Sequence, residues 1–440
     1  MNERARALIE AAYWAAVEEV DPLIAVLDTI DVFDGYALFD GTRVELPAGV
    51  VVVAIGKAAV TMTQGAVQAL GDEITSGIAI TKDGHSGDAS FDMIEIHEAS
   101  HPIPDRRGVE ATQRAIEIVE SADRDAVVLC LISGGGSALF EAPRPPVTLD
   151  DLAEVTRLML RAGATIDELN QVRRPLSLVK GGGFLNAIGS RTVVTLILSD
   201  VLGNDLSTIA SGPTVPSHDS PGAALARLDQ FGLTDKVPES VITVLSSEQE
   251  GRQTRPELFL SAVVADNRDA IHGARTSLES NGLTEEARWI DVEGEAREMG
   301  RLWADECSRC PDAIDALVGG GEMTVTVTGD GVGGRNTEFA LAAAMRLREL
   351  GNRDWLVASL ATDGQDGPTG VAGAILGADD IDQMIEAGID LDSVLAENDS
   401  LIPLRAVGAD FETGPTGTNA NDIYLAIRVS AVNASDAGSV

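Results

Sequence analysis

Short apolar runs separate longer segments of helical periodicity in the first half of the chain. Val50–Ile55 reads VVVVAI, a continuous apolar stretch typical of a strand that is buried on both faces. Further strands are predicted at 77–81, 94–97, 126–132 and 192–198, and helices at 58–70, 106–122 and 148–163. Because strands that alternate with helices form parallel sheets covered by those helices, the predicted fold class is α/β.

The second half repeats this alternation. Strands are predicted at 258–265, 316–318, 355–360 and 423–429, and helices begin at Asn267 and Glu295. A chain of 440 residues is too long for one ordinary hydrophobic core, so two or three domains are expected. The loose acidic segment 238–256 is the best linker candidate. We therefore predict an N-terminal domain at 1–245 and a C-terminal domain at 257–440.

The segment 318–350 combines a strand pattern, two glycine clusters and a helix pattern. Apolar residues alternate with threonines at 323–328, which predicts a half-buried strand. The four glycines of 329–334 let the backbone turn tightly and come close to a ligand. Asn336 then stands where a helix N-cap is expected, and Glu338 suits the first turn. Arg335 carries a positive charge where the helix dipole disfavours one, which indicates a function. The alternative is a glycine-rich hairpin with a solvated arginine.

Two glycine-containing loops directly follow predicted buried strands. Gly56 and Lys57 come after Val50–Ile55, and the run Ser133, Gly134, Gly135, Gly136, Ser137 comes after 126–132. A strand, a glycine loop and a helix start are a common arrangement for binding an anion through backbone N–H groups. Neither loop is a Walker P-loop or a GxGxxG dinucleotide fingerprint. A surface lysine and a flexible turn are the plainer interpretations.

Other polar residues cluster in loops. His101 lies in the proline-rich segment EASHPIPD, either as a ligand contact or as a turn residue. Arg173, Arg174 and Lys180 stand close together in sequence, as expected for residues that face a small anion.

Three aspartates are candidate metal ligands. Asp200 follows the strand 192–198, where it could hold Mg²⁺, orient a hydroxyl or cap the loop. Asp363 and Asp366 stand three residues apart in a glycine-containing loop, and two close carboxylates suit Mg²⁺.

The charge of the chain narrows the range of partners. Its 70 acidic residues outnumber its 32 basic ones, giving a formal net charge of -38. Such a chain repels nucleic acid and anionic lipid, and we interpret its surface as one suited to high salt, as in a halophile. Only four of the basic residues are lysines, which draws attention to Lys57 and Lys180 beside glycines. Three cysteines and the absence of a membrane-length apolar run lead us to expect a cytoplasmic protein.

Seven motifs, in order, resemble those of the ATP-dependent glycerate 2-kinases, whose C-terminal domain is called MOFRL. They are AIGKAAV (54–60), SGGGSAL (133–139), VKGGG (179–183), SDVLGNDLSTIASGPTV (199–215), GGRNTEFALA (333–342), TDGQDGPT (362–369) and GPTGTN (414–419). The chain departs from the family pattern at Ser100, Asn204 and Pro175. The last departure leaves any histidine role at that position open.

The resemblance implies a Rossmann-like N-terminal domain with a parallel sheet, a second α/β domain with a mixed sheet, and an active site in the cleft between them. It implies transfer of the ATP γ-phosphoryl group to the 2-hydroxyl of D-glycerate, with Lys57 and Arg335 as the catalytic residues. Substrate or phosphate contacts are expected from Ser133, Gly134, Gly135, Gly136, Ser137, Arg173, Lys180, Asp200, Asn336, Glu338, Thr416 and Asn419. The expected Mg²⁺ ligands are Asp200, Asp363 and Asp366.

Two other functions compete with this one. A hydroxypyruvate reductase would use glycine loops to hold NAD(P)H, but the chain lacks the dinucleotide fingerprint. A non-catalytic sensor of nucleotides or sugar acids would need no cationic clamp. The expected partners are glycerate and ATP, with no nucleic acid and no membrane, and a homodimer is left open.

Overall fold

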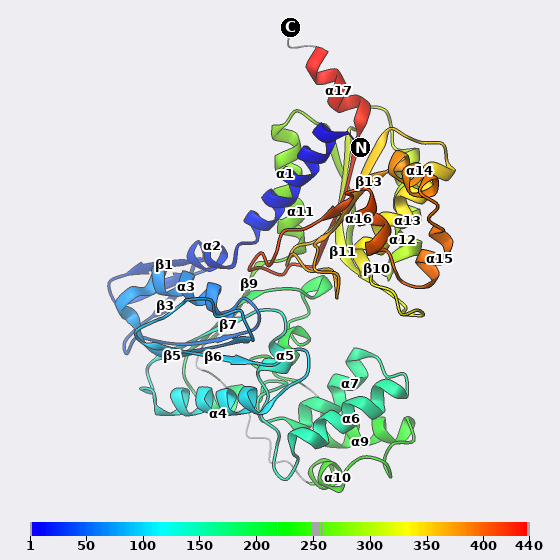
Figure 1. The fold of residues 1–440 in the computed structure, drawn as a ribbon. Helices are drawn as coiled ribbons and strands as arrows, with labels where there is room; N and C mark the ends of the chain where they lie inside the picture. The colour runs from blue at the N-terminus through cyan, green and yellow to red at the C-terminus, as the bar shows by residue number, and fades with distance from the viewer. Residues whose placement is uncertain (1, 218, 248–255, 257, 438–440) are drawn as a thin grey trace. The chain divides into compact units, whose positions relative to one another are not determined.

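The computed structural model describes residues 2–217, 219–247, 256 and 258–437. Contacts divide the chain into two compact units (Figure 1). Unit 1 consists of Met1–Asp21 and Ala265–Val440, and unit 2 of Pro22–Val264. These ranges differ from the predicted 1–245 and 257–440 because the first helix packs with the C-terminal unit and the strand Phe259–Ala265 joins the sheet of unit 2. Part of the predicted linker, 248–255, lies outside the described residues.

Unit 2 is built on a six-stranded sheet in the order β6-β5-β4-β7-β8-β9. Pairing is parallel from β6 through β8, so the prediction of a Rossmann-like parallel sheet is confirmed. The strands are β4 (Val50–Ile55), β5 (Ile74–Lys82), β6 (Ile94–Ala99), β7 (Val127–Ile132), β8 (Val193–Leu198) and β9 (Phe259–Ala265). The chain runs from β4 outward to β6 and then returns to β7 on the other side. The strand order therefore reverses between β4 and β7, where open α/β sheets bind ligands.

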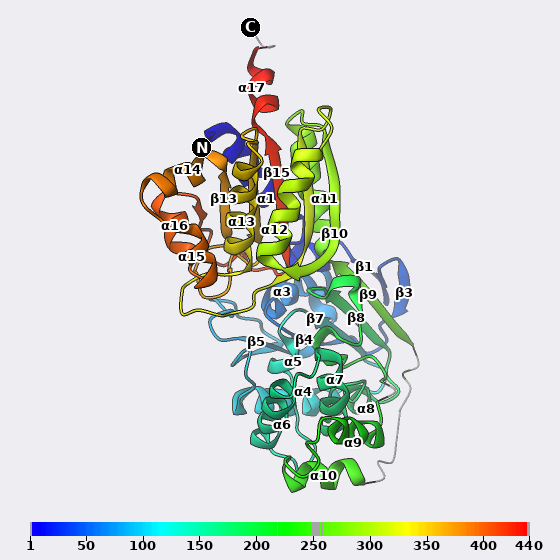
Figure 2. The same ribbon diagram turned by 90° about the vertical axis from the view of Figure 1, so that its right-hand side faces the viewer.

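Helices cover both faces of this sheet, α3 on one face and α4 with α8 on the other (Figures 1 and 2). The helices of the unit are α2 (Pro22–Leu27), α3 (Ala59–Leu70), α4 (Arg106–Ser121), α5 (Gly136–Leu139), α6 (Leu149–Arg161), α7 (Ile166–Arg173), α8 (Phe184–Ile188), α9 (Pro221–Gln230) and α10 (Glu239–Ser246). Single 3₁₀ turns are η1 (Gly71–Glu73), η2 (Arg174–Leu176), η3 (Leu202–Asn204) and η4 (Ile209–Ser211). Helices α6, α7, α9 and α10 enclose a separate small core.

A small antiparallel sheet, β1 (Ile30–Phe33), β2 (Tyr36–Phe39) and β3 (Thr42–Glu45), completes unit 2. The sequence pattern does not predict this sheet, because its strands are only four residues long and β1 and β3 each bury a single side chain.

Unit 1 contains a mixed six-stranded sheet in the order β10-β11-β15-β12-β13-β14, as predicted. The first pair is parallel and the others are antiparallel. The strands are β10 (Glu285–Glu295), β11 (Ala316–Thr324), β12 (Trp355–Ala361), β13 (Gly373–Gly377), β14 (Asp410–Phe411) and β15 (Asp422–Arg428). The helices are α1 (Glu3–Glu19), α11 (Asn267–Ser280), α12 (Ala296–Arg309), α13 (Arg335–Glu349), α14 (Ala378–Glu386), α15 (Leu391–Ala396), α16 (Leu401–Ala406) and α17 (Val429–Ala437).

Helix α1 joins unit 1 because its apolar face packs on α11 and on the sheet. The buried residues Ala5, Ile9, Ala12 and Ala16 recur at helical spacing. Tyr13 anchors the same face, since its hydroxyl donates a hydrogen bond to the Ala361 carbonyl at 3.0 Å. Figures 1 and 2 show α1 and α11 on one side of this sheet and α12 and α13 on the other.

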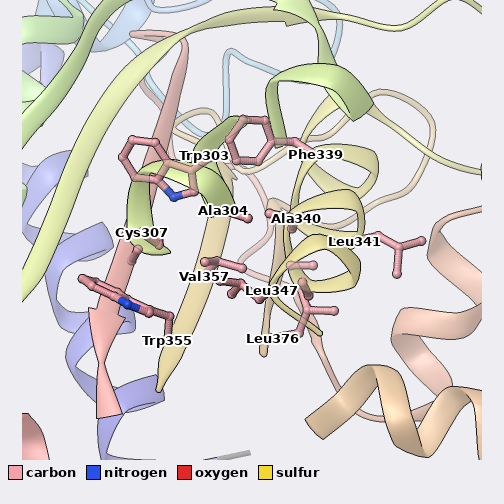
Figure 3. Packing of buried hydrophobic residues seen from close by; sticks show 14 of the residues in the cluster. Trp303, Ala304, Cys307, Phe339, Ala340, Leu341, Leu347, Trp355, Val357 and Leu376 are labelled. Carbon is pink, nitrogen blue, oxygen red and sulfur yellow. The ribbon is translucent and has the colours of Figure 1, made fainter. Parts of the chain in front are cut away.

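The core between α12, α13 and the sheet is aromatic at its centre (Figure 3). Phe339 of α13 stacks on Tyr424 of β15 with ring centroids 4.7 Å apart. Trp303 of α12 meets Tyr424 edge to face. Helices α12 and α13 approach closely at Gly300, where an added Cβ would overlap the Phe339 carbonyl and lie 3.2 Å from the Ala343 nitrogen. This contact fixes the position of α13, whose first residue is Arg335.

Two local predictions around α13 were wrong. The strand covers 316–324 rather than 323–328, and 325–328 pairs with no strand of the described chain. The threonines of this segment make contacts outside a sheet instead: Thr326 bonds to Glu295 and Thr328 bonds to Asn398. The N-cap is Gly334, not Asn336, because Gly334 donates its N–H to the Thr337 hydroxyl at 2.8 Å. In the described residues no helix is long and apolar enough to cross a membrane.

We expect Gly300→Ala to lower the free energy of unfolding by about 1–3 kcal/mol, because the new methyl group pushes α12 away from the α13 backbone. The matched control is Gly222→Ala in α9, where an added Cβ meets nothing within 4 Å. That variant should change stability by less than about 0.5 kcal/mol. Urea unfolding at constant KCl measures both, and equal values would contradict this packing.

Candidate functional site

In unit 2, the loops after β4 and β7 are bonded to each other at the point where the strand order reverses. The Lys57 N–H donates to the Gly134 carbonyl at 2.8 Å, and the Ala58 N–H donates to the Ser133 hydroxyl at 3.1 Å. Ser133 in turn donates its N–H to the Ile55 carbonyl at 2.9 Å. The structure therefore brings together Lys57 and the Ser133–Ser137 loop, which the sequence predicted as two separate anion sites.

Two glycines make this approach possible. Gly56 has φ +122°, and an added Cβ would lie 2.5 Å from the Ser133 carbonyl oxygen, so only glycine fits between the loops. Gly135 has φ +83°, and its Cβ position lies 3.3 Å from Cγ of Lys57. The lysine side chain therefore passes directly beside the second loop.

Lys180 supports this loop from inside the protein. Its side chain is only 1% exposed, and its Nζ donates to the Ser137 carbonyl at 2.6 Å and to the Ser137 hydroxyl at 3.2 Å. Burial lowers the Lys180 pKa to about 8, although the Glu141 carboxylate at 3.4 Å opposes that shift. Lys180 therefore orders the loop in this structure and does not present its charge to solvent.

The other two basic residues of this cluster also have protein partners. Arg174 donates to Asp219 at 2.6 Å and to the Ser207 carbonyl at 2.8 Å. Arg173 is partly exposed and lies 3.8 Å from Glu141. All three residues were predicted to face a small anion. In the structure, Lys180 and Arg174 bind other parts of the protein instead.

Asp200 lies at the carboxyl end of β8, the strand next to β7. It is partly exposed, whereas Ser199 before it is buried. A carboxylate at this edge of the sheet can meet a ligand that the two loops bind.

In unit 1, Arg335 is the first residue of α13 and is held by two carboxylates. Its Nη1 donates to Glu322 at 2.8 Å, and its Nη2 donates to Oδ1 of Asp422 at 3.1 Å. Its Nε lies 2.7 Å from the second Asp422 oxygen. The helix dipole disfavours a cation here by about 0.3–1 kcal/mol, and the two carboxylates offset this cost. Among the described residues these contacts leave N–H groups on both terminal nitrogens for a ligand.

Sheet pairing explains how Arg335 and Asp422, which are 87 positions apart in the sequence, meet. Asp422 begins β15 and pairs with Gly321 near the end of β11 on one side and with Ala361 at the end of β12 on the other. Since β15 is antiparallel to both neighbours, its first residue lies at their carboxyl ends. Asp422 and Glu322 were not predicted from the sequence. The signal for Asp422 is a lone acid immediately before the apolar strand IYLAI.

Asp422 is fully buried, and burial raises its pKa to about 6, because the charged form loses its hydration. Arg335 and Asn336 oppose that shift by stabilising the carboxylate. The charge of Asp422 therefore changes near pH 6, and with it the force that holds Arg335.

Asn336 and Asp366 form the buried start of α13. Asp366 accepts hydrogen bonds from the backbone N–H groups of Asn336 at 2.9 Å and Thr337 at 2.8 Å. It also accepts one from the Thr337 hydroxyl at 2.8 Å. The Asn336 side chain donates to Asp422 at 3.0 Å. Asp366 therefore acts as an anion at a helix N-terminus, and both of its oxygens are engaged.

The glycines of 329–334 approach another segment of the protein, 397–400. An added Cβ at Gly329 or Gly331 would lie 2.5 Å from the Glu397 carbonyl oxygen, and one at Gly333 would lie 2.7 Å from the Asn398 carbonyl oxygen. We expected these glycines to admit a ligand. In the structure they admit the backbone of a neighbouring turn.

Asn398 is the centre of that turn. Its side-chain oxygen accepts the N–H groups of Thr328 at 2.7 Å and Gly329 at 3.1 Å. Its side-chain nitrogen donates to Glu338 at 3.2 Å. Glu338 is fully buried and also lies 2.7 Å from the Arg297 guanidinium. Burial raises the Glu338 pKa, while Asn398 and Arg297 oppose that shift. Glu338 thus lies inside the protein, and its expected contact with a ligand stays a prediction.

The remaining predicted residues share the edge of the sheet where Asp422 lies. Thr416 donates its hydroxyl to the Thr362 carbonyl at 2.6 Å and its N–H to the Asp363 carbonyl at 3.3 Å. Asp363 is partly exposed, and one of its carboxylate oxygens accepts the Gln365 N–H at 2.9 Å. Asn419 is buried at the same loop. The predicted residues of unit 1 therefore gather at one end of its sheet.

We expect Asn398→Ala to lower the free energy of unfolding by about 2–4 kcal/mol, because the N–H groups of Thr328 and Gly329 lose their acceptor and the buried Glu338 loses one of its two partners. Asn398 has φ +53°, so Asn398→Gly should be less damaging by about 1 kcal/mol, since it loses the same bonds without backbone strain. Urea unfolding at constant KCl measures both. Amide hydrogen exchange at 326–334 should rise in each variant, and unchanged exchange would contradict the role of Asn398.

Comparisons with known proteins agree with this architecture. Residues 8–246 match the domain of unknown function DUF4147, and residues 315–422 match the MOFRL family. A D-glycerate 2-kinase of Thermotoga maritima is 38% identical over 86% of this chain and 91% of its own length. A protein of Agrobacterium vitis, named provisionally as a hydroxypyruvate reductase, is 38% identical over 95% of this chain and 93% of its own.

The crystal structure of a glycerate kinase from Thermotoga maritima superposes with a TM-score of 0.84 at 36% identity, covering 96% of this chain and 100% of that one. The similarity therefore extends through both units and the strands and loops that carry the residues described above. The chain belongs to the glycerate 2-kinase family, with its DUF4147 and MOFRL domains.

Proposed function

We propose that this protein transfers the γ-phosphoryl group of ATP to the 2-hydroxyl of D-glycerate, giving 2-phosphoglycerate. The observation that carries the proposal is Lys57, which lies beside a glycine loop where the parallel sheet reverses its order. A lysine and backbone N–H groups at such a site suit a phosphate. Membership of a family that includes glycerate 2-kinases supports the same reaction.

Lys57 and Arg335 have the same role in this proposal. Phosphoryl transfer needs alignment of the reactants and stabilisation of the negative charge on the transferred group, with little covalent help from the protein. Lys57 acts as a compact positive charge, and Arg335 offers N–H donors that Asp422 and Glu322 hold in one orientation. The Ser133–Ser137 loop supplies backbone N–H groups to the same anion.

A magnesium complex of the nucleotide would supply charge neutralisation on its phosphates. Such a complex needs only one or two protein carboxylates in addition to its phosphate ligands. The partly exposed Asp200 and Asp363 fit this need. Asp366 does not, because helix α13 uses both of its oxygens. Of the predicted cations for the glycerate carboxylate, Arg173 fits best, because Lys180 and Arg174 are used in folding.

One experiment tests both the kinase and the alternative, a hydroxypyruvate reductase. Purified protein in concentrated KCl should convert ATP to ADP only when glycerate is present, and should not oxidise NADH or NADPH with hydroxypyruvate. The reverse pattern would replace the kinase with the reductase. If the protein catalyses neither reaction, a non-catalytic ligand-binding protein is the remaining interpretation. We also propose a cytoplasmic location, since the three cysteines are buried thiols that suit a reducing compartment.

We expect Lys57→Met and Arg335→Met each to lower kcat by about a thousandfold or more, because each removes a positive charge from the transferred phosphoryl group. Matched controls are Lys236→Met and Arg301→Met, which remove surface cations and should retain wild-type turnover. Loss in the double variant should be much smaller than the product of the single losses if both cations serve one step. Near-normal turnover of either single variant would contradict its role.

We expect kcat to fall as the pH drops through about 6, because protonation of Asp422 removes the charge that holds Arg335. Above that pH the carboxylate is ionised and the arginine is held. Asp422→Asn should lower kcat at neutral pH and abolish this acid limb, whereas Glu322→Gln should keep it, since Asp422 remains. An acid limb that persists unchanged in Asp422→Asn would contradict the assignment.

A further inference from the structure

Unit 2 gathers basic residues around the Lys57 loop, which is unusual in a chain of net charge -38. Lys57 follows β4, Lys82 ends β5 with His85 just beyond it, and His101 follows β6. The ring nitrogen Nδ1 of His85 lies 3.2 Å from the Lys57 carbonyl oxygen. Lys57, Lys82 and His85 all act electrostatically on His101. Positive charge kept together in so acidic a protein marks a place for an anion.

His101 takes part in this cluster through one edge of its ring. The point where a Cβ of Gly135 would stand lies 3.1 Å from Cδ2 and 3.3 Å from Nε2 of His101, and 3.3 Å from Cγ of Lys57. A small space beside Gly135 is therefore bounded by the His101 ring edge, the Lys57 side chain and the loop backbone. Any residue larger than glycine at position 135 would fill it. In the part of the chain that the structure describes, no hydrogen bond to the imidazole is found.

The electrostatics of His101 suit a neutral hydrogen-bond donor. Its pKa is lowered to about 4, first because the ring is partly buried and second because Lys57, Lys82 and His85 repel a further positive charge. Near neutral pH the ring therefore carries one N–H group and no charge. Such a group can donate to an oxyanion, but the ring is a weak base, so it is poorly suited to remove a proton.

We propose that His101 is a catalytic residue that donates its Nε2–H to a phosphoryl oxygen held by Lys57 and the Ser133–Ser137 loop. The inference rests on the proposed function, because it assigns a further contact within the phosphate site of that kinase. The ligand class is a phosphoryl oxyanion, on ATP or on the transferred group. The Lys57 ammonium attracts the oxyanion by its charge, without a preferred direction. His101 would add a hydrogen bond of defined direction.

His97 provides a matched control. It lies on β6, four residues before His101, and its partly exposed ring lies 3.2 Å from the Glu95 carboxylate. Substituting it removes an imidazole from the same part of the sheet without touching the Lys57 loop. A structural role for His101 as a turn residue would be seen in the stability of its variants, which unfolding measurements detect separately.

The kinetic test uses His101→Ala, His101→Asn and His101→Gln with His97→Gln as control. We expect His101→Ala and His101→Asn to lower kcat about 10- to 100-fold, the scale of a lost hydrogen bond to charge in a transition state. His101→Gln should recover most of that loss, because its amide nitrogen reaches the position of Nε2. His97→Gln should match wild type. Wild-type kcat in folded His101→Ala would overturn the proposal.

The spectroscopic test follows the His101 ring by NMR in protein labelled with ¹³C-histidine, with and without MgATP or inorganic phosphate. A bound oxyanion stabilises the protonated ring, so the His101 pKa should rise from its low value by about one unit or more, while the His97 resonance should not move. An unchanged His101 titration in a protein that phosphorylates glycerate overturns this inference alone. A shifted titration in a protein without kinase activity supports the anion contact and rejects the proposed reaction.

Discussion

The ion pair between Arg335 and the buried Asp422 is the interaction on which the unit 1 site depends. A guanidinium at the start of a helix is opposed by the helix dipole, and a carboxylate without exposure to water is opposed by desolvation. Each charge offsets the cost of the other, so neither would be stable alone. The sheet enforces the pairing, because β15 begins where β11 and β12 end. The helix start, the two strand ends and the loop after β12 therefore form one rigid support.

Close backbone approach is the second constraint, and glycine satisfies it in both units. Gly56 lets the Lys57 loop lie against Ser133, and Gly329, Gly331 and Gly333 let the loop before Arg335 lie against 397–400. In the first case the glycines bring a cation to a set of backbone N–H groups. In the second they seat a long loop on a turn fixed by Asn398. The same residue type thus shapes the proposed phosphate site in one unit and a scaffold in the other.

Features that arise from neighbouring residues could be predicted from the sequence, whereas features that depend on distant residues could not. Continuous apolar runs such as Val50–Ile55 predicted the parallel sheet, because strands buried on both faces leave no other pattern. The glycine loops and Arg335 were visible as local departures from ordinary preferences. Asp422 and Asn398 were not, since their importance comes from residues distant in sequence. Asn336 and Glu338 are buried and bonded within the protein, to Asp422 and Asn398, so their expected contact with a ligand stays a prediction.

The most direct measurement is ³¹P NMR of the product formed from ATP, Mg²⁺ and D-glycerate in concentrated KCl. The account predicts one new phosphomonoester resonance, coupled to the single proton on carbon 2 and formed together with ADP. A resonance coupled to the two protons of carbon 3, or no phosphorylated glycerate at all, would contradict it.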